Sequence, residues 1–311
     1  MIKISDEIVF KGNQNNVCDM ISDSLVREYM IHDSNSKCNI YVVGVSDYII
    51  LSGRVLSNAC IDKKKVIDKV LDEVKYSKKY KLLDNINIEK HNIKIRSNFN
   101  INKEDAIIYG FACNDNLKYL PTSMVILEEL KSEYEKLYMS DNRFGSNGYA
   151  KIEGIFNKDL KLIKIENFII NYQTKSKNTD NIIKKICINI SNKYNIKIEK
   201  FTINQNNKLI SNDFSKSRGC SGVNRDIYHG YEELSTIDFS GKDNYSLGKN
   251  ILYKSRCIAL NYLKKLNLRW CSVRINYVKG VNIPIDILVN SDIGKISIPK
   301  KLYKECDINS I

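Results

Sequence analysis

The residues whose types and spacing are best suited to chemistry form the turn at 239–243, Phe-Ser-Gly-Lys-Asp. Gly241 allows a tight turn or a close approach of the backbone to a ligand, and Lys242 places an ammonium group beside it. A helix is predicted to begin near Ser246, and its free N–H groups and positive dipole end favour a nearby anion. A turn, a lysine and a helix N-terminus together suit phosphate. Taken alone, the segment is more typical of a plain surface turn than of a phosphate site.

The length, composition and cysteine count of the sequence argue against several classes of protein. The chain has 311 residues, of which 43% are hydrophobic, which is enough for two or three units with real cores. It contains no run of about 18 apolar residues and no signal-peptide pattern at its N-terminus, so we expect neither a membrane span nor export. The nine cysteines form no Cys-x-x-Cys pair and only three histidines are present, which argues against a zinc site and a disulfide framework. We therefore expect a protein of the reducing cytoplasm.

The formal net charge of +13 is typical of some nucleic-acid-binding proteins. However, the lysines are spread along the chain instead of forming one cluster. A solvated basic surface, or a site for a polyanionic small molecule such as ATP, explains this distribution better. Nucleic-acid binding is therefore the least favoured interpretation.

Hydrophobic periodicity predicts the same order of elements in successive parts of the chain. In the first part we expect a strand and then a helix capped by Asn15 or Asn16. We place Asp19 and Asp23 on the solvent face of this helix, with a position facing the site as the less favoured alternative. A hairpin at residues 39–56, a helix at 62–80 and a strand at 86–95 follow. The second part predicts a helix opened by Pro121, strands at 149–156 and 160–171, a helix around 182–190 and a strand at 196–203. The third part predicts a long helix at 247–266 and strands at 269–278 and 283–289.

Strand pairs joined by short turns indicate mixed or antiparallel sheets with helices on one face, which is an α+β fold. We place the unit boundaries near residues 98 and 213. The predicted organisation is thus an N-terminal unit at 1–98, a central unit at 99–213 and a C-terminal unit at 214–311.

Four segments, in this order, resemble the methionine adenosyltransferases, the S-adenosylmethionine synthetases. Residues 12–23, Gly-Asn-Gln-Asn-Asn-Val-Cys-Asp-Met-Ile-Ser-Asp, are similar to the family's Gly-His-Pro-Asp-Lys segment and its Ala-Asp-x-Ile-Ser-Asp helix. Residues 108–114, Ile-Tyr-Gly-Phe-Ala-Cys-Asn, resemble Met-Phe-Gly-Tyr-Ala-Thr-Asn, and the Leu-Pro at 120–121 follows as Met-Pro does in the family. Residues 239–243 are identical to the family's Phe-Ser-Gly-Lys-Asp, and residues 269–284 resemble its Arg-Cys-Glu-Val-Gln-Val-Ser-Tyr segment.

The resemblance implies three βαββαβ-like units about a pseudo-threefold axis, with a C-terminal end shorter than that of the family. It also implies a homodimer, or a hetero-oligomer with another synthetase-like subunit, whose active sites lie between subunits. The family's reaction joins ATP and methionine by attack of the methionine sulfur on the ribose C5′, with release of triphosphate. Mg²⁺ and K⁺ are the cofactors that the family implies.

Residue by residue, the resemblance assigns three kinds of site. The catalytic candidates are Lys242 and Asn13. The candidates for nucleotide and phosphate binding are Lys208, Arg218, Asp238, Phe239, Gly241, Lys242 and Asp243. Glu104 and Asp105 are the candidates on the methionine side, and Asn15 is the candidate metal ligand.

Several positions depart from the family pattern. Asn13 replaces the motif histidine and Asn15 replaces the Mg²⁺-binding aspartate, so neither can provide the original charge. Asn16 replaces a lysine and Asn39 a glutamate that helps bind K⁺, whereas Arg54 reverses the charge of a glutamate that contacts methionine. The family reaction needs cationic stabilisation of a highly charged leaving group. The replacements therefore place two hypotheses level: a variant adenosyltransferase, and a catalytically lapsed paralogue that acts as a binding or regulatory subunit.

Overall fold

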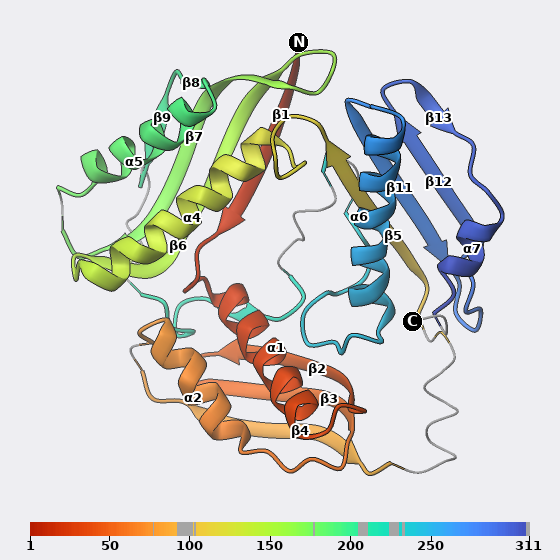
Figure 1. The fold of residues 1–311 in the computed structure, drawn as a ribbon. Helices are drawn as coiled ribbons and strands as arrows, with labels where there is room; N and C mark the ends of the chain where they lie inside the picture. Colours follow the sequence, from red (N-terminus) through yellow and green to blue (C-terminus); the bar gives the residue numbers. More distant parts are fainter. Residues whose placement is uncertain are drawn as a thin grey trace.

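The computed structural model describes residues 1–76, 78–91, 102, 104–176, 178–204, 211–223, 230–231 and 234–308. Three units, each a sheet with helices packed on it, surround a common centre (Figure 1). The predicted α+β fold with three similar units is confirmed. Within these residues, no helix combines the length and the apolar character that crossing a bilayer requires.

The N-terminal sheet has the strand order β10-β2-β3-β4. Its elements are α1 (Gln14–His32), β2 (Lys37–Val45), β3 (Tyr48–Leu56), α2 (Lys63–Glu73), β4 (Lys81–Glu89) and β10 (Gly219–Cys220). The predicted hairpin is confirmed, with Ser46 at a positive φ of 56° in its turn. The predicted cap of α1 was wrong by two residues, because the side chain of Asn13 accepts the N–H of Asn15. Helix α2 ends at Glu73 instead of residue 80, since Lys75 adopts a positive φ that stops the helix.

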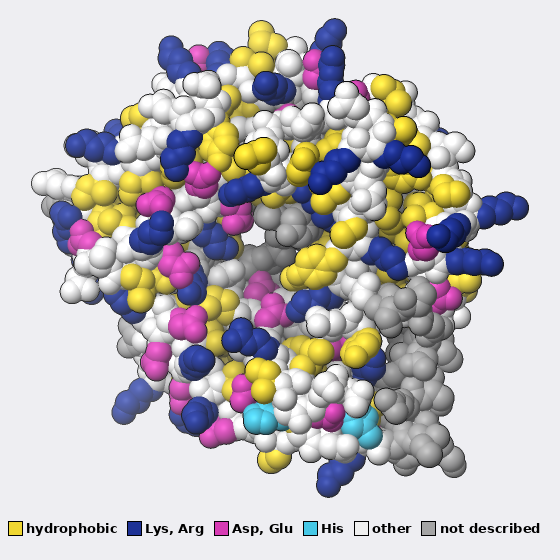
Figure 2. Space-filling model, in the orientation of Figure 1, with side chains coloured by type: hydrophobic (Ala, Val, Ile, Leu, Met, Phe, Trp, Pro, Cys, Tyr) yellow, Lys and Arg dark blue, Asp and Glu magenta, His cyan; other side chains and the backbone are white. Residues whose placement is uncertain are grey.

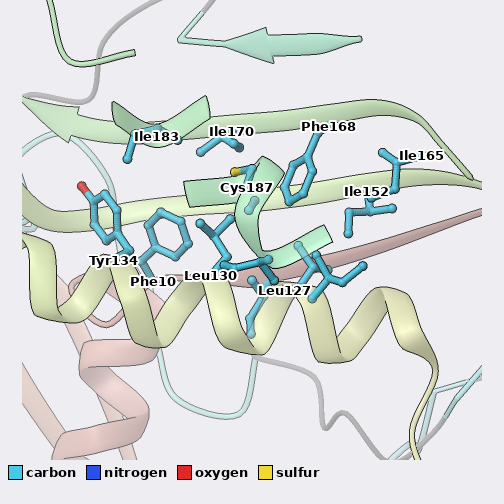
Figure 3. Packing of buried hydrophobic residues seen from close by; sticks show 14 of the residues in the cluster. Phe10, Leu127, Leu130, Tyr134, Ile152, Ile165, Phe168, Ile170, Ile183 and Cys187 are labelled. Atoms are coloured by element: carbon cyan, nitrogen blue, oxygen red, sulfur yellow. The ribbon is translucent and has the colours of Figure 1, made fainter. Parts of the chain in front are cut away.

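The central sheet has the order β1-β6-β7-β8, with β9 also paired to β7. Its elements are β1 (Ile2–Val9), α4 (Thr122–Ser140), β6 (Phe144–Phe156), β7 (Leu162–Thr174), α5 (Asp180–Lys193), β8 (Lys197–Ile198) and β9 (Phe201–Ile203). Figure 3 shows Leu127 and Leu130 of α4 directed towards Ile152 and Phe168 of the sheet. These side chains are fully buried and form the core of the unit.

The C-terminal sheet has the order β13-β12-β11-β5. Its elements are β5 (Ala106–Cys113), α6 (Leu247–Lys265), β11 (Trp270–Tyr277), β12 (Asp286–Ser291), β13 (Gly294–Ile296) and α7 (Lys301–Glu305). Helix α6 crosses β5 with backbone against backbone, because a Cβ on Gly110 would lie 2.3 Å from the carbonyl carbon of Ser255. Only glycine allows this close approach.

Each sheet contains one strand that comes from a distant part of the chain, and the exchange is cyclic. Strand β1, which precedes the N-terminal sheet, pairs with β6 of the central sheet, so that Ile2 lies opposite Phe156. Strand β5 precedes the helices of the central sheet and pairs with β11 of the C-terminal sheet. Strand β10 precedes α6 and pairs with β2 of the N-terminal sheet. The predicted boundary at residue 98 falls outside the described residues, and both boundaries stay predictions.

A buried carboxyl group marks the contact between β1 and α4. Asp6 of β1 is 7% exposed, and the hydroxyl of Ser123 donates a hydrogen bond to it. Burial raises the pKa of Asp6 to about 6, although the Ser123 hydrogen bond offsets part of the effect. Asp115, which follows β5, also has its pKa raised to about 6 by burial. Both groups therefore favour the protonated state more strongly in the folded chain than in the unfolded one.

We predict that the protein becomes less stable as the pH rises from about 4 to about 6, because the folded state binds more protons than the unfolded state in this window. The rise of the Asp6 pKa from 3.8 to about 6 corresponds to roughly 3 kcal/mol. Asp6→Asn should remove this part of the pH dependence and leave the part due to Asp115. Urea unfolding followed by circular dichroism across this range measures the effect.

The matched control for this experiment is Glu133→Gln, which removes an exposed carboxylate from α4. The control should keep the full pH dependence of the original protein. An Asp6→Asn variant with the same dependence as the control would contradict the assignment of the effect to Asp6.

Candidate functional site

Residues 239–243 lie along the edge of β2, beyond the part of that edge that β10 covers. The carbonyl of Gly241 accepts the N–H of Ile40 at 2.8 Å, and the N–H of Asp243 donates to the carbonyl of Cys38 at 3.2 Å. Gly241 has a φ of +73°, and a Cβ there would lie 1.9 Å from the carbonyl oxygen of Ile40. The turn therefore requires glycine, both for its backbone conformation and for its distance from β2.

Lys242 is a buried cation, with 4% of the residue exposed. Its Nζ donates to Asn39 Oδ1 at 2.7 Å and to the hydroxyl of Tyr41 at 2.9 Å. Glu104 Oε1 lies 3.7 Å away, on a side chain that is 39% exposed. The two nearest partners are thus neutral, and the carboxylate is beyond hydrogen-bond distance. Glu104 therefore forms a loose, partly exposed ion pair with Lys242, while the direct hydrogen bonds of the ammonium group go to neutral oxygens.

The carboxylate of Asp243, next to Lys242, stabilises the backbone around the turn. Its Oδ2 accepts the N–H of Cys38 at 2.5 Å and its Oδ1 accepts the N–H of Tyr245 at 2.8 Å. Burial raises the pKa of Asp243, and the two backbone hydrogen bonds oppose that rise. The carboxylate connects β2 to the segment that leads into α6.

Two aspartates of α1 hold the same turn from the opposite side. Asp19 Oδ1 accepts the hydroxyl of Ser240 and the N–H of Gly222, the latter at 2.7 Å. Asp23 Oδ1 accepts the N–H of Gly241 at 3.0 Å and lies 3.1 Å from Lys249 Nζ. The expectation that both aspartates face solvent was therefore wrong.

The four-residue spacing of Asp19 and Asp23 places them on one face of α1, and that spacing was the available signal. Helical periodicity shows which residues share a face, but it does not show that a distant turn covers it. Tyr41 and Lys249 were also missed. Tyr41 stands two residues from Asn39 on β2, so the two side chains share a face of the strand.

Asn13 and Asn15 stabilise the start of α1. Asn13 caps the helix, and Asn15 Oδ1 accepts the N–H of Cys220 in β10 at 3.0 Å. The amide oxygen of Asn15 is neutral and already has a partner, and both carboxylate oxygens of Asp243 accept backbone N–H groups. Among the described residues, no three or more His, Cys, Asp or Glu side chains form a group that could hold a metal ion. These donors do not fit the Mg²⁺ that the resemblance implies.

The remaining predicted residues lie in different surroundings. The carboxylate of Asp238 lies beside Gly222, since a Cβ on Gly222 would be 2.7 Å from Asp238 Oδ1. The ring of Phe239 packs edge-on against the ring of Tyr253. Arg218 is exposed just before β10. Asp105 is exposed and accepts the N–H of Lys279 at 2.9 Å. Lys208 lies outside the described residues. The structure therefore brings Glu104 to Lys242 but directs Asp105 elsewhere, and the ligand roles of all these residues stay predictions.

The comparisons with known proteins agree with this geometry. Residues 2–98 match the family model of the S-adenosylmethionine synthetase N-terminal domain. The S-adenosylmethionine synthase of Mycoplasmopsis pulmonis is 27% identical over 301 residues, which cover 92% of this chain and 80% of that protein. The synthase of Mycoplasma capricolum is 24% identical, with 98% of this chain and 85% of that protein covered.

A solved structure described as an unusual S-adenosylmethionine synthetase from Campylobacter jejuni has the same fold. It superimposes with a TM-score of 0.82 at 18% identity and covers 99% of this chain and 88% of that one. The matching N-terminal domain, the relatives along nearly the whole chain and the shared fold lead to one conclusion. The chain is a divergent relative of the methionine adenosyltransferases, or S-adenosylmethionine synthetases, and is similar to them along nearly its whole length.

Proposed function

We propose that the protein binds ATP, or a related adenosyl compound, with the phosphates near Lys242. It transfers the adenosyl group from ATP to a sulfur nucleophile such as that of methionine and releases triphosphate. The observation that supports this proposal is the buried ammonium group of Lys242, whose nearest partners are the neutral Asn39 and Tyr41. The similarity to S-adenosylmethionine synthetases supports the same class of ligand.

The energetics of burial explain why Lys242 is informative. A buried charge is costly unless a group of opposite charge compensates it. Arg256, the other buried cation in the described part of the chain, donates to the carbonyls of Tyr119 and Lys118 and has a structural task. The ion-pair partner of Lys242 is Glu104, at 3.7 Å on a side chain that is 39% exposed. A polyphosphate would bring further negative charge to this ammonium group.

The same site offers little help to the chemical step. Charge develops on the triphosphate leaving group, and cations or metal ions that stabilise it usually contribute most of the rate enhancement. Here Asn13 and Asn15 are neutral and hold the start of α1, and the donors do not fit Mg²⁺. We therefore expect slow transfer by this chain alone.

A second candidate function follows from these structural roles of Asn13 and Asn15. The protein would then be a binding or regulatory subunit that pairs with a second synthetase-like chain, which brings the missing charged groups. Such an assembly, or a homodimer, is the partner arrangement that we propose. Nucleic-acid binding gains no support from the face drawn in Figure 2, where Lys and Arg side chains are scattered and mixed with acidic ones.

We predict that Lys242→Met weakens ATP binding by about 10- to 100-fold, because a charged hydrogen-bond donor contributes roughly 1.5–3 kcal/mol. Binding of adenosine, which has no phosphate, should stay unchanged. Titration calorimetry with each ligand measures the difference. The control is Lys264→Met, which removes a lysine near the end of α6 that lies over the ring of Tyr119. Equal ATP affinity in the Lys242 and Lys264 variants would refute the assignment of the phosphates to Lys242.

The two candidate functions differ in turnover. The protein would be incubated with ATP, methionine, Mg²⁺ and K⁺, alone and mixed with a complete synthetase, while S-adenosylmethionine and triphosphate are followed. We expect slow product formation by the chain alone. Turnover that rises only in the mixture, beyond that of the complete synthetase, supports the subunit function. Binding of neither ATP nor S-adenosylmethionine, with no turnover in either condition, excludes both.

The oxygen atoms of Asn15 and Asp243 also predict how Mg²⁺ affects thermal unfolding when no nucleotide is present. We expect Mg²⁺ alone to leave the thermal midpoint of unfolding unchanged, since the oxygens of Asn15 and Asp243 already accept backbone N–H groups. Differential scanning fluorimetry with and without Mg²⁺ tests this, with matched ionic strength as the control. A midpoint that rises with Mg²⁺ concentration would show that the chain has a metal site after all.

A further inference from the structure

Asp23 of α1 and Lys249 of α6 form an ion pair directly beside the turn that bears Lys242. Asp23 Oδ1 and Lys249 Nζ are 3.1 Å apart, and their side chains are 38% and 16% exposed. The same Asp23 oxygen accepts the N–H of Gly241 at 3.0 Å. Lys249 Nζ also lies 3.3 Å from the carbonyl oxygen of Lys242 and 5.1 Å from the centre of the Phe239 ring.

These contacts fix the peptide units on both sides of the Gly241 Cα. Ile40 of β2 donates to the carbonyl of Gly241, whereas Asp23 of α1 accepts the N–H of the same residue. Lys249 then donates to the next carbonyl, that of Lys242. Because one polar group is held in each of three consecutive peptide units, the Cα–Cβ bond of Lys242 has a fixed direction. That direction carries the ammonium group to Asn39 and Tyr41.

The charge of Lys249 itself is already balanced. Its partner Asp23 is a carboxylate at hydrogen-bond distance, whereas Lys242 has only neutral partners at that distance. The two lysines, seven residues apart, therefore differ in how closely a carboxylate approaches them. Lys249 has one at 3.1 Å, whereas the carboxylate that pairs with Lys242, that of Glu104, lies at 3.7 Å.

We propose that Asp23 and Lys249 are positioning residues that hold the Lys242 ammonium in place for an anionic ligand. The inference rests on the proposed function of Lys242 as the phosphate contact. The pair acts through the backbone of residues 241 and 242 and touches no substrate. Its loss releases the turn, so that Lys242 no longer keeps its buried position.

The first test follows the accessibility of Lys242 without any ligand. Intact protein is treated with an amine-acylating reagent, and the rate of modification of Lys242 is measured by mass spectrometry. We expect Asp23→Asn and Lys249→Met to increase that rate by about fivefold or more, as for the loss of a charged hydrogen bond. Lys249→Arg, which keeps the charge, should restore protection. Glu28→Gln, which removes an exposed carboxylate from the same helix, is the control and should change nothing.

The second test separates positioning from a purely structural role. Affinities for ATP and for adenosine are measured by calorimetry, together with the thermal midpoint of each variant. Positioning predicts that Asp23→Asn weakens ATP binding selectively, so that the ATP-to-adenosine affinity ratio falls by about fivefold. A structural role predicts a lower midpoint and equal weakening of both ligands, and that result would overturn the proposal.

The outcomes also separate this inference from the proposed function. A wild-type protein without affinity for ATP counts against the proposed function, and the acylation rates then decide the positioning role by themselves. Unchanged acylation of Lys242 in both Asp23→Asn and Lys249→Met overturns the positioning role, whether or not the protein binds ATP.

Discussion

The structure depends on the pairing of one short segment with the free edges of two sheets. Along residues 235–243, Thr236 exchanges hydrogen bonds with Ile107 at the edge of β5, and Gly241 accepts the N–H of Ile40 at the edge of β2. Unpaired strand edges expose polar backbone groups and invite association with other chains. By covering both edges, this segment joins the C-terminal sheet to the N-terminal sheet. The candidate site lies where the segment crosses from one sheet to the other.

This constraint explains why the turn keeps the family sequence although several of its usual partners are replaced. The hydroxyl of Ser240 binds Asp19, Gly241 fits where no side chain could, and the carboxylate of Asp243 holds the N–H of Cys38. Each of these residues has a task in the fold. Lys242 differs, because its buried charge has no carboxylate at hydrogen-bond distance. The fold therefore accounts for most of the turn, and the proposed anionic ligand is our explanation for the lysine.

Hydrophobic periodicity was sufficient to predict the three units, because the helices and hairpins are set by neighbours in the sequence. The cyclic exchange of β1, β5 and β10 was not predictable in this way, since strand partners are chosen by contacts between distant segments. The same limit applies to the site. The turn was recognised from its sequence, whereas the roles of Asp23 and Lys249 depend on α1 and α6 lying beside it. Local patterns define which face of a helix is polar, but tertiary packing decides what that face binds.

The exchange of strands has a consequence for the synthesis of the protein. Strand β1 leaves the ribosome well before its partner β6, and β2 leaves it well before β10, which covers part of its outer edge. A chain whose contacts connect such distant positions folds slowly, because loops must close before the contacts stabilise them. The early strands stay unpaired during this time and are open to aggregation. Rapid completion of translation, or a chaperone that covers the early strands, would shorten this exposure.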